Sequence, residues 1–141
     1  MENIYLITCA KTKTSSRSPA SELYISPNFR KLKALAAKRA ERWYILSAKY
    51  GLLEPKQVID PYELTLNDMS KAERREWAGR VFQQLAKEIV PEDRGTILAG
   101  QKYWGGLKPL LEEYGCEVFT PLKGVTQFKW GQWLNKELAD D

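Results

Sequence analysis

Residues 43–47 read Trp43-Tyr44-Ile45-Leu46-Ser47 and form a short run that is almost entirely apolar. Three further runs share this character: residues 4–9, 96–100 and 116–119. Strands that are apolar without alternation are typical of parallel sheets covered on both faces, because both sides of each strand are then buried. The four runs therefore predict a mostly parallel, four-stranded sheet.

Helical patterns separate and follow these runs. Four segments have apolar residues at spacings of three and four: residues 27–41, 70–90, 107–114 and 127–138. Ser70 and Glu73 form a capping-box pattern at the start of the second segment, and Gly115 marks the end of the third. Strands alternating with helices predict an α/β fold with right-handed crossovers. We expect a single α/β domain over residues 1–141, with three layers in which helices flank the sheet.

The composition excludes several classes of protein. No apolar run approaches the roughly 18 residues of a membrane-spanning helix, and residues 1–9 read as a strand rather than a signal peptide. Cys9 and Cys116 lie far apart in apolar runs, which favours reduced thiols and a cytoplasmic location. The chain contains no histidine, which excludes histidine-dependent triads and histidine-ligated zinc. It also has neither a phosphate-binding loop nor a GxGxxG motif, so we expect no metal and no cofactor.

Positive charge is concentrated in the first part of the chain. Residues 1–56 contain eleven Lys and Arg against four Asp and Glu, whereas the remainder contains eleven against fourteen. Such an excess favours a polyanion such as nucleic acid or a phosphorylated metabolite. Arg17, Arg30 and Lys31 are candidate contacts to a nucleic-acid backbone. For the basic run 30–42, a solvated helix face is the alternative.

Each predicted strand is followed by lysine beside small or hydroxyl residues. Ligands of open parallel sheets bind outside the carboxyl ends of the strands, where these segments are expected to meet. Lysines and backbone N–H groups would hold a phosphate, tyrosines would stack on a base, and glycines would let the ligand approach closely. The alternative is that the lysines lie in loops only because loops are solvated. The candidate ligand-binding residues are Cys9, Lys11, Lys13, Tyr24, Ser47, Lys49, Tyr50, Gly51, Gly100, Gln101, Lys102 and Tyr103.

Three acids are candidate catalytic residues. Asp60 and Glu63 flank Pro61-Tyr62, and Glu22 lies two residues before a tyrosine. A carboxyl group near a ring and shielded from water has a raised pKa, which suits a general base or an electrostatic stabiliser. The alternatives are structural: Asp60 would be a turn or N-cap acid, Glu22 would form a salt bridge, and Glu63 would be an exposed acid at the start of a helix.

Three segments, together with a closing Gln127, Trp133 and Leu134, carry a family resemblance. Residues 19–24 read Pro-Ala-Ser-Glu-Leu-Tyr, residues 47–53 read Ser-Ala-Lys-Tyr-Gly-Leu-Leu, and residues 61–66 read Pro-Tyr-Glu-Leu-Thr-Leu. They resemble a family of small prokaryotic and phage proteins of unknown function, whose members usually carry aspartate at the position of Glu63. That family is distantly similar to peroxide-stress DNA-binding proteins and to domains with a uracil-DNA-glycosylase-like α/β core. The resemblance agrees with a ligand that has negative charge and a flat ring.

Three functions fit these observations. The first is a DNA glycosylase-like hydrolase of an N-glycosidic bond, in which Asp60 or Glu22 acts at the sugar and lysines and amides stabilise the departing base. The second is a non-enzymatic module that binds DNA or a nucleotide in conflict between phage and host. The third is a protein-interaction domain with an exposed apolar patch, for which Trp104, Trp130 and Trp133 are candidates. An acid in the same pocket as the lysines would favour the enzyme over the binding module.

Overall fold

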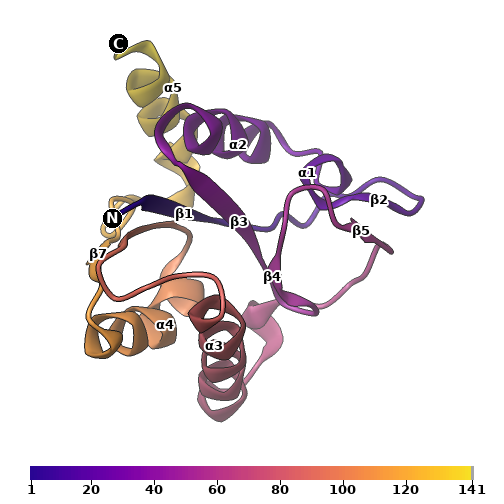
Figure 1. Cartoon of the computed structure of the whole chain (residues 1–141). Coiled ribbons are helices and arrows are strands. Elements are labelled where there is room, and N and C mark those ends of the chain that lie inside the picture. Colours follow the sequence, from indigo (N-terminus) through magenta and orange to yellow (C-terminus); the bar gives the residue numbers. More distant parts are fainter. Residues whose placement is uncertain (141) are drawn as a thin grey trace.

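The computed structural model describes residues 1–140 and contains one large sheet and one small sheet (Figure 1). The strands of the large sheet are β1 (Asn3–Thr8), β3 (Arg42–Ser47), β4 (Gly51–Leu53), β6 (Arg94–Leu98) and β7 (Glu117–Phe119). Their order is β4-β3-β1-β6-β7. All neighbours run parallel except β3 and β4, which form an antiparallel hairpin. The sheet is therefore mixed but mostly parallel.

The prediction of four strands is wrong by one. β4 lies in what the sequence presents as a long connection, and it pairs with β3 so that Leu53 faces Ile45 and Gly51 faces Ser47. Gly51 makes the turn with a φ of 76°, in the left-handed region that glycine adopts without strain. A three-residue strand is too short to show a periodic pattern, so only the tertiary pairing reveals it.

Helices cover both faces of the large sheet. The α-helices are α1 (Ala20–Leu23), α2 (Pro27–Arg39), α3 (Lys71–Ala86), α4 (Gln101–Tyr114) and α5 (Trp130–Ala139). Short 3₁₀ turns are η1 (Leu66–Asp68) and η2 (Gln127–Lys129), and the small antiparallel sheet joins β2 (Ser18–Pro19) to β5 (Val58–Ile59). None of the helices within residues 1–140 combines the length and hydropathy that crossing a membrane requires.

The helix signals in the sequence are largely confirmed. Ser70 and Glu73 form the predicted capping box of α3, and Gly115 ends α4 with a φ of 118°. The predicted start of α4 at residue 107 is wrong, because the helix begins at Gln101. Two glycines and Pro109 within α4 weaken its pattern, although the first turn is already helical. Three predicted ligand-binding residues, at positions 101–103, therefore lie on a helix rather than in a loop.

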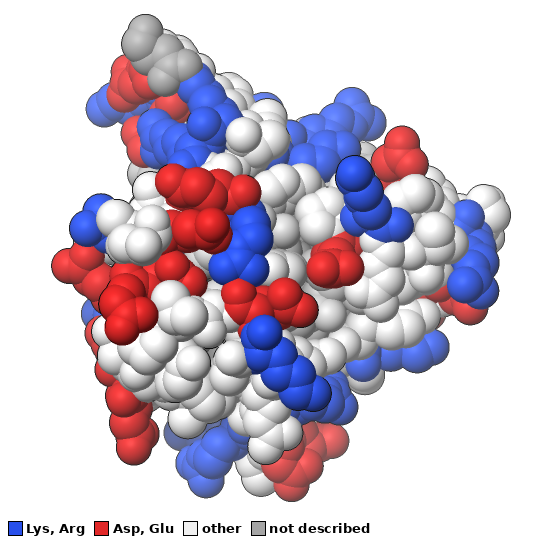
Figure 2. Space-filling model, viewed as in Figure 1, with Lys and Arg blue, Asp and Glu red and all other residues white. Residues whose placement is uncertain are grey.

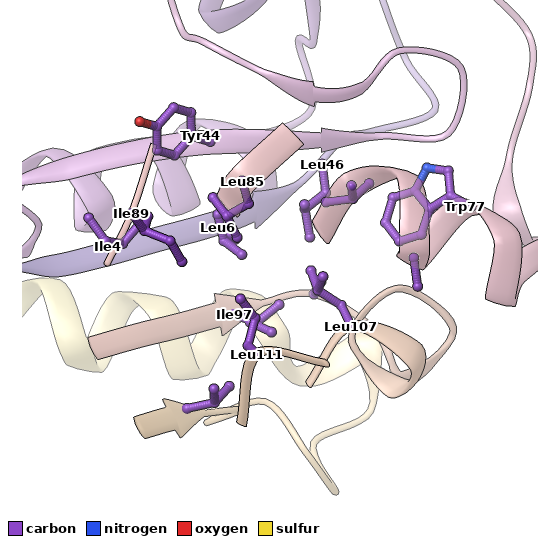
Figure 3. Packing of buried hydrophobic residues seen from close by; sticks show 14 of the residues in the cluster. Ile4, Leu6, Tyr44, Leu46, Trp77, Leu85, Ile89, Ile97, Leu107 and Leu111 are labelled. Carbon is purple, nitrogen blue, oxygen red and sulfur yellow. The ribbon is translucent and has the colours of Figure 1, made fainter. Parts of the chain in front are cut away.

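Side chains alternate between the two faces of β1. Ile4 and Leu6 pack against α3 and α4, whereas Ile7 packs against α2 and α5. Figure 1 shows the two pairs of helices on opposite sides of the sheet, and Figure 3 shows Leu85 and Leu107 on the face of Ile4 and Leu6. Because both faces are covered, the central strands β1, β3 and β6 are mostly apolar and bury side chains on both sides. This arrangement leaves the carboxyl ends of the parallel strands as the accessible edge.

Candidate functional site

A cleft of about 1080 Å³ opens at the carboxyl ends of β1 and β6. Residues 8–13, which follow β1, form one wall, and residues 100–103, which follow β6, form another. The start of α2, residues 63–65, 67 and 68, Gln127 and Trp130 complete the lining. This is where open parallel sheets bind ligands, and the volume slightly exceeds the roughly 300–1,000 Å³ of small-molecule sites.

The cleft brings together eight of the predicted site residues from three separate segments. Those that line it are Cys9, Lys11, Lys13, Glu63, Gly100, Gln101, Lys102 and Tyr103. The other predicted site residues do not line it: Arg17, Glu22, Tyr24, Arg30, Lys31, Ser47, Lys49, Tyr50, Gly51 and Asp60. The structure therefore places three lysines and one predicted acid around a single cleft.

The three lysines differ in how firmly they are held. The Nζ of Lys13 lies 4.6 Å from the ring centroid of Tyr62 and 5.8 Å from that of Tyr24. It also donates a hydrogen bond of 3.1 Å to the carbonyl oxygen of Lys11. Lys11 and Lys102 are exposed. Lys13 is thus a positioned cation, because the tyrosine faces attract its ammonium group, while Lys11 and Lys102 add exposed positive charge.

Two helix N-termini add to this positive potential. The first turn of α4 lines the cleft, and its N-cap residue Gly100 offers no side-chain acceptor to the helix. The start of α2 also lines the cleft, and the Ser26 hydroxyl accepts a hydrogen bond from the Phe29 amide at 3.1 Å. The first N–H groups of a helix carry partial positive charge and bind anions. The cleft therefore attracts negative charge from several directions.

Tyr103 forms part of the wall of the cleft. Its ring packs edge-on against Trp77 at 5.5 Å between centroids, and its Oη lies 3.5 Å from the Sγ of Cys9. Burial raises the pKa of Tyr103 above its usual range, so the hydroxyl stays protonated. Tyr103 is consequently held by the core, with its ring against Trp77 and its hydroxyl beside Cys9.

A buried hydroxyl cluster lies beneath the cleft. The Oη of Tyr62 accepts a hydrogen bond from Ser47 Oγ at 2.7 Å and lies 2.6 Å from the Oη of Tyr24. Burial raises the pKa of both tyrosines, and Ser47 Oγ also accepts from the Tyr50 amide at 3.1 Å. Each of the three segments that carry the family resemblance contributes one hydroxyl. Tyr24 and Ser47, predicted to bind ligand, instead join these segments in the core.

The residues that follow Ser47 form the turn into β4. Lys49 lies outside the cleft, with its Nζ 5.3 Å from the ring centroid of Tyr50. The Tyr50 hydroxyl donates to the backbone carbonyl of Asp60 at 3.2 Å. A side chain at Gly51 would meet the Gln84 amide, because a Cβ there would lie about 2.3 Å from its oxygen. These contacts give this turn a structural role.

The three predicted acids occupy different positions. Asp60 lies 3.9 Å from Arg17, and both side chains are about two-thirds exposed, so Asp60 forms an exposed ion pair rather than the turn or N-cap contact that was its alternative. Glu22 is exposed on α1. Glu63 lines the cleft, where it is joined by Asp68, a residue of the long connection 50–69 that was not predicted as a site residue. Within residues 1–140, no group of three or more Cys, Asp and Glu side chains is arranged to hold a metal ion.

Glu63 owes its position to two buried neighbours. Tyr62 is 7% exposed and Leu66 is fully buried. Residues 63–65 lie between these two buried side chains and form part of the cleft lining. Glu63 and Asp68 themselves are exposed to solvent. The arrangement places two carboxylates at the cleft without burying them.

The basic run on α2 is largely engaged within the protein. Arg39 forms an ion pair with Glu137 at 3.0 Å, and Lys33 donates to a backbone carbonyl of α1 at 3.0 Å. Arg30 and Lys31 lie on the same helix, outside the cleft lining. Figure 2 shows acidic and basic side chains interspersed on the face it presents. These contacts favour the interpretation of this run as a structural and solvated face.

The aromatic residues near the C-terminus do not form the predicted tryptophan patch. Trp130 is 5% exposed, and its Nε1 donates to the Val125 carbonyl at 3.1 Å. Trp104 and Trp133 are partly buried against the two cores. Phe128, which the sequence analysis passed over, is instead 95% exposed. No periodic signal distinguishes it, because it falls in a 3₁₀ turn.

Comparison with known proteins identifies relatives of the chain. Residues 4–136 match a family of unknown function, DUF6884. A UPF0246 protein of Cellvibrio japonicus is 34% identical over 88 residues, which cover 57% of this chain and 33% of that protein. A UPF0246 protein of Polynucleobacter necessarius is 31% identical over 85 residues, which cover 55% of this chain and 32% of that protein. The match thus spans about one third of the length of these curated relatives.

Proposed function

We propose that this protein, which belongs to the DUF6884 family of unknown function, binds a nucleotide or nucleic acid in the cleft and hydrolyses its N-glycosidic bond. The preferred substrate is a modified base in DNA. The observation that carries the proposal is the gathering of Lys11, Lys13 and Lys102 with Glu63 in one cleft. The distant resemblance to DNA-binding and glycosylase-like proteins agrees with it.

Phosphate recognition is the first part of the proposed function. Three ammonium groups and two helix N-termini face one cleft, and charge-assisted hydrogen bonds to phosphate are about twice as strong as neutral ones. Lys13 is already positioned by Tyr62, so little side-chain entropy is lost when it binds. Lys11 and Lys102 would close on the ligand from opposite walls.

Cleavage of the N-glycosidic bond is the second part. The bond between the sugar C1′ and the base nitrogen breaks, its electron pair leaves with the base, and a water oxygen bonds to C1′. Glu63, with Asp68 beside it in the cleft lining, would stabilise positive charge on the sugar or take the proton of the attacking water. Gln101, Lys102 and the first N–H groups of α4 would stabilise negative charge on the departing base, which then takes up a proton.

A second candidate function is binding without turnover. The observation in its favour is the exposure of both acids at the cleft, Glu63 and Asp68, together with the position of Asp60 and Glu22 outside the lining. A carboxylate surrounded by water stabilises a sugar cation less than one in a shielded site. Such a module would use the same lysines to hold the ligand.

The test of phosphate recognition is DNA binding at about 50 and 200 mM salt. The double variant Lys11→Gln/Lys102→Gln should weaken binding and lower the slope of log K against log salt by about 2. The control, Lys56→Gln/Lys87→Gln, removes the same charge from exposed positions outside the cleft and should leave the slope nearly unchanged. Equal effects of the two double variants would refute binding in the cleft.

The test of hydrolysis is release of free base from DNA with and without modified bases. Glu63→Gln should abolish base release and preserve binding, whereas Glu112→Gln, an exposed acid on α4 outside the cleft, should preserve both. Binding with no base released by the unmodified protein on any of these substrates would support the second candidate. No binding of DNA or nucleotide would reject both.

A further inference from the structure

A second hollow adjoins the cleft. Its volume is about 330 Å³, and it shares Gly100, Gln101 and Trp130 with the lining of the cleft. Its other walls are residues 122–126 and Trp104. Lys123 belongs to this lining, with its Nζ 5.9 Å from the ring centroid of Trp104. Positive charge therefore continues from the cleft into the next hollow along the same edge of the sheet.

Phe128 lies on the segment that borders both hollows. Thr126 lines the second hollow, Gln127 lines the cleft and Trp130 lines both. The Phe128 ring is 95% exposed, so it contributes almost no apolar burial to the fold. Lys129 follows directly and is exposed. The segment thus carries an exposed apolar ring and an exposed positive charge in consecutive residues, beside the cleft and the second hollow.

The backbone around Phe128 is held in place. The Lys129 amide donates to the Thr126 carbonyl at 2.8 Å, and the buried Trp130 indole donates to the Val125 carbonyl. These bonds anchor the turn on both sides of the exposed ring. A ring presented on an anchored turn loses little conformational entropy when it stacks on a partner.

We infer that the ligand is a single-stranded nucleic acid, whose backbone passes from the cleft into the second hollow while Phe128 stacks on an unpaired base. The inference rests on the proposed function and names its substrate class. The two hollows together exceed what a small-molecule site of about 300–1,000 Å³ provides. Exposed aromatic rings beside lysines are the features with which proteins hold single strands, because unpaired bases offer free faces for stacking.

Other ligands would use these features differently. A free mononucleotide would fill part of the cleft and leave Phe128 in water. The bases of a duplex are already stacked on one another, so an exposed ring gains nothing from them unless a base is first extruded. Single-stranded DNA satisfies the lysines of both hollows and the exposed ring at the same time.

The experiment compares the full chain binding three probes: oligothymidylate of about eight nucleotides, thymidine monophosphate, and a duplex of the same length. The oligomer should bind at least about tenfold more tightly than the mononucleotide. Phe128→Ala should weaken oligomer binding by about 5- to 150-fold, since stacking is worth about 1–3 kcal/mol per base, and should leave mononucleotide binding unchanged. Phe128→Trp should preserve the affinity for the oligomer.

The matched control is Phe119→Ala. This exposed phenylalanine on β7 is 43% accessible, and neither it nor its chain neighbours Val118 and Thr120 line a hollow, so its loss should not change binding. Equal affinities for oligomer and mononucleotide, with no effect of Phe128→Ala, would overturn the inference and leave the proposed function standing. Tighter duplex binding that is insensitive to Phe128→Ala would also overturn it. Failure of all three probes to bind would reject the inference and the proposed function together.

Discussion

Replacing Tyr62 with phenylalanine should destabilise the protein and leave Lys13 in position. The substitution removes a single hydroxyl at the point where three segments of the chain meet. That hydroxyl lies 2.6 Å from the Oη of Tyr24 and accepts a hydrogen bond from Ser47 at 2.7 Å. All three side chains are buried, so water cannot replace the lost partner.

The expected loss follows from these contacts. Each of the two hydrogen bonds contributes about 0.5–1.5 kcal/mol, and a buried group left without a partner costs about 1–3 kcal/mol. Ser47 Oγ keeps its bond from the Tyr50 amide, so its O–H is the donor left without its acceptor. We therefore expect the free energy of unfolding to fall by about 2–4 kcal/mol. The aromatic ring remains, so its attraction for Lys13 is preserved.

Urea denaturation followed by tryptophan fluorescence measures this loss as a lower midpoint at an unchanged m-value. The control is Tyr114→Phe, which removes a hydroxyl whose bond to the Ile89 carbonyl is long, at 3.4 Å, and should cost under about 1 kcal/mol. Tyr62→Phe combined with Tyr24→Phe should cost less than the sum of the two single changes. By contrast, Tyr62→Leu removes the ring and should also weaken nucleotide binding.

Two outcomes would refute this reasoning. A loss below about 0.5 kcal/mol for Tyr62→Phe, or a loss equal to that of Tyr114→Phe, would mean that the hydroxyl cluster does not join the three segments. Strict additivity of Tyr62→Phe and Tyr24→Phe would mean that the two hydroxyls are not coupled.

Three further changes test other parts of the fold. Burial alone raises the pKa of Asp93, but hydrogen bonds from two backbone amides and the nearby Arg42 outweigh burial and lower that pKa. The ionised carboxylate therefore stabilises the fold above the usual carboxyl pKa of about 4, and this stabilisation is lost as pH falls below it. Asp93→Asn should consequently flatten the decline in Tm on acidification. Gly115→Ala should lower stability by at least about 1–2 kcal/mol in denaturant titrations, because φ is 118° and a Cβ would lie 2.9 Å from Pro91. Ser70→Ala should cost about 1 kcal/mol by removing the capping box of α3, measured as a lower Tm, and an unchanged Tm would show that the cap contributes nothing.

Much of the fold could be predicted because its signals are local. The apolar runs that became β1, β3 and β6 have buried side chains on both faces, whereas β7 buries only Val118. The capping box of α3 lies within residues close together in the sequence. β4 could not be predicted in this way, because its three residues pair with β3 only after the chain turns back. The early start of α4 was hidden by its glycines and proline, whose weak helix propensity the packing of α4 overrides.

The site was partly predictable for the same reason. The sheet topology brings the segments after β1 and β6 to one edge, so Lys11, Lys13 and Lys102 met as expected. The sequence could not show whether Asp60 or Glu63 faces the cleft, because their positions depend on the path of the connection 50–69. Its path turns Asp60 toward Arg17 and Glu63 toward the cleft.

The sequence by itself determined a mostly parallel α/β sheet with lysines at its carboxyl edge. Apolar runs and helical spacing can be read from neighbouring residues, and the order of strands and helices follows from their positions in the chain. Only the tertiary structure decided which acid faces those lysines, which aromatic ring stays exposed and which hydroxyls are buried together. These features depend on contacts between segments far apart in the chain, such as Ser47 with Tyr62 and Tyr62 with Tyr24. Buried hydroxyl groups form hydrogen bonds with whichever polar groups the fold places beside them, and residue spacing in the sequence does not predict which groups those are.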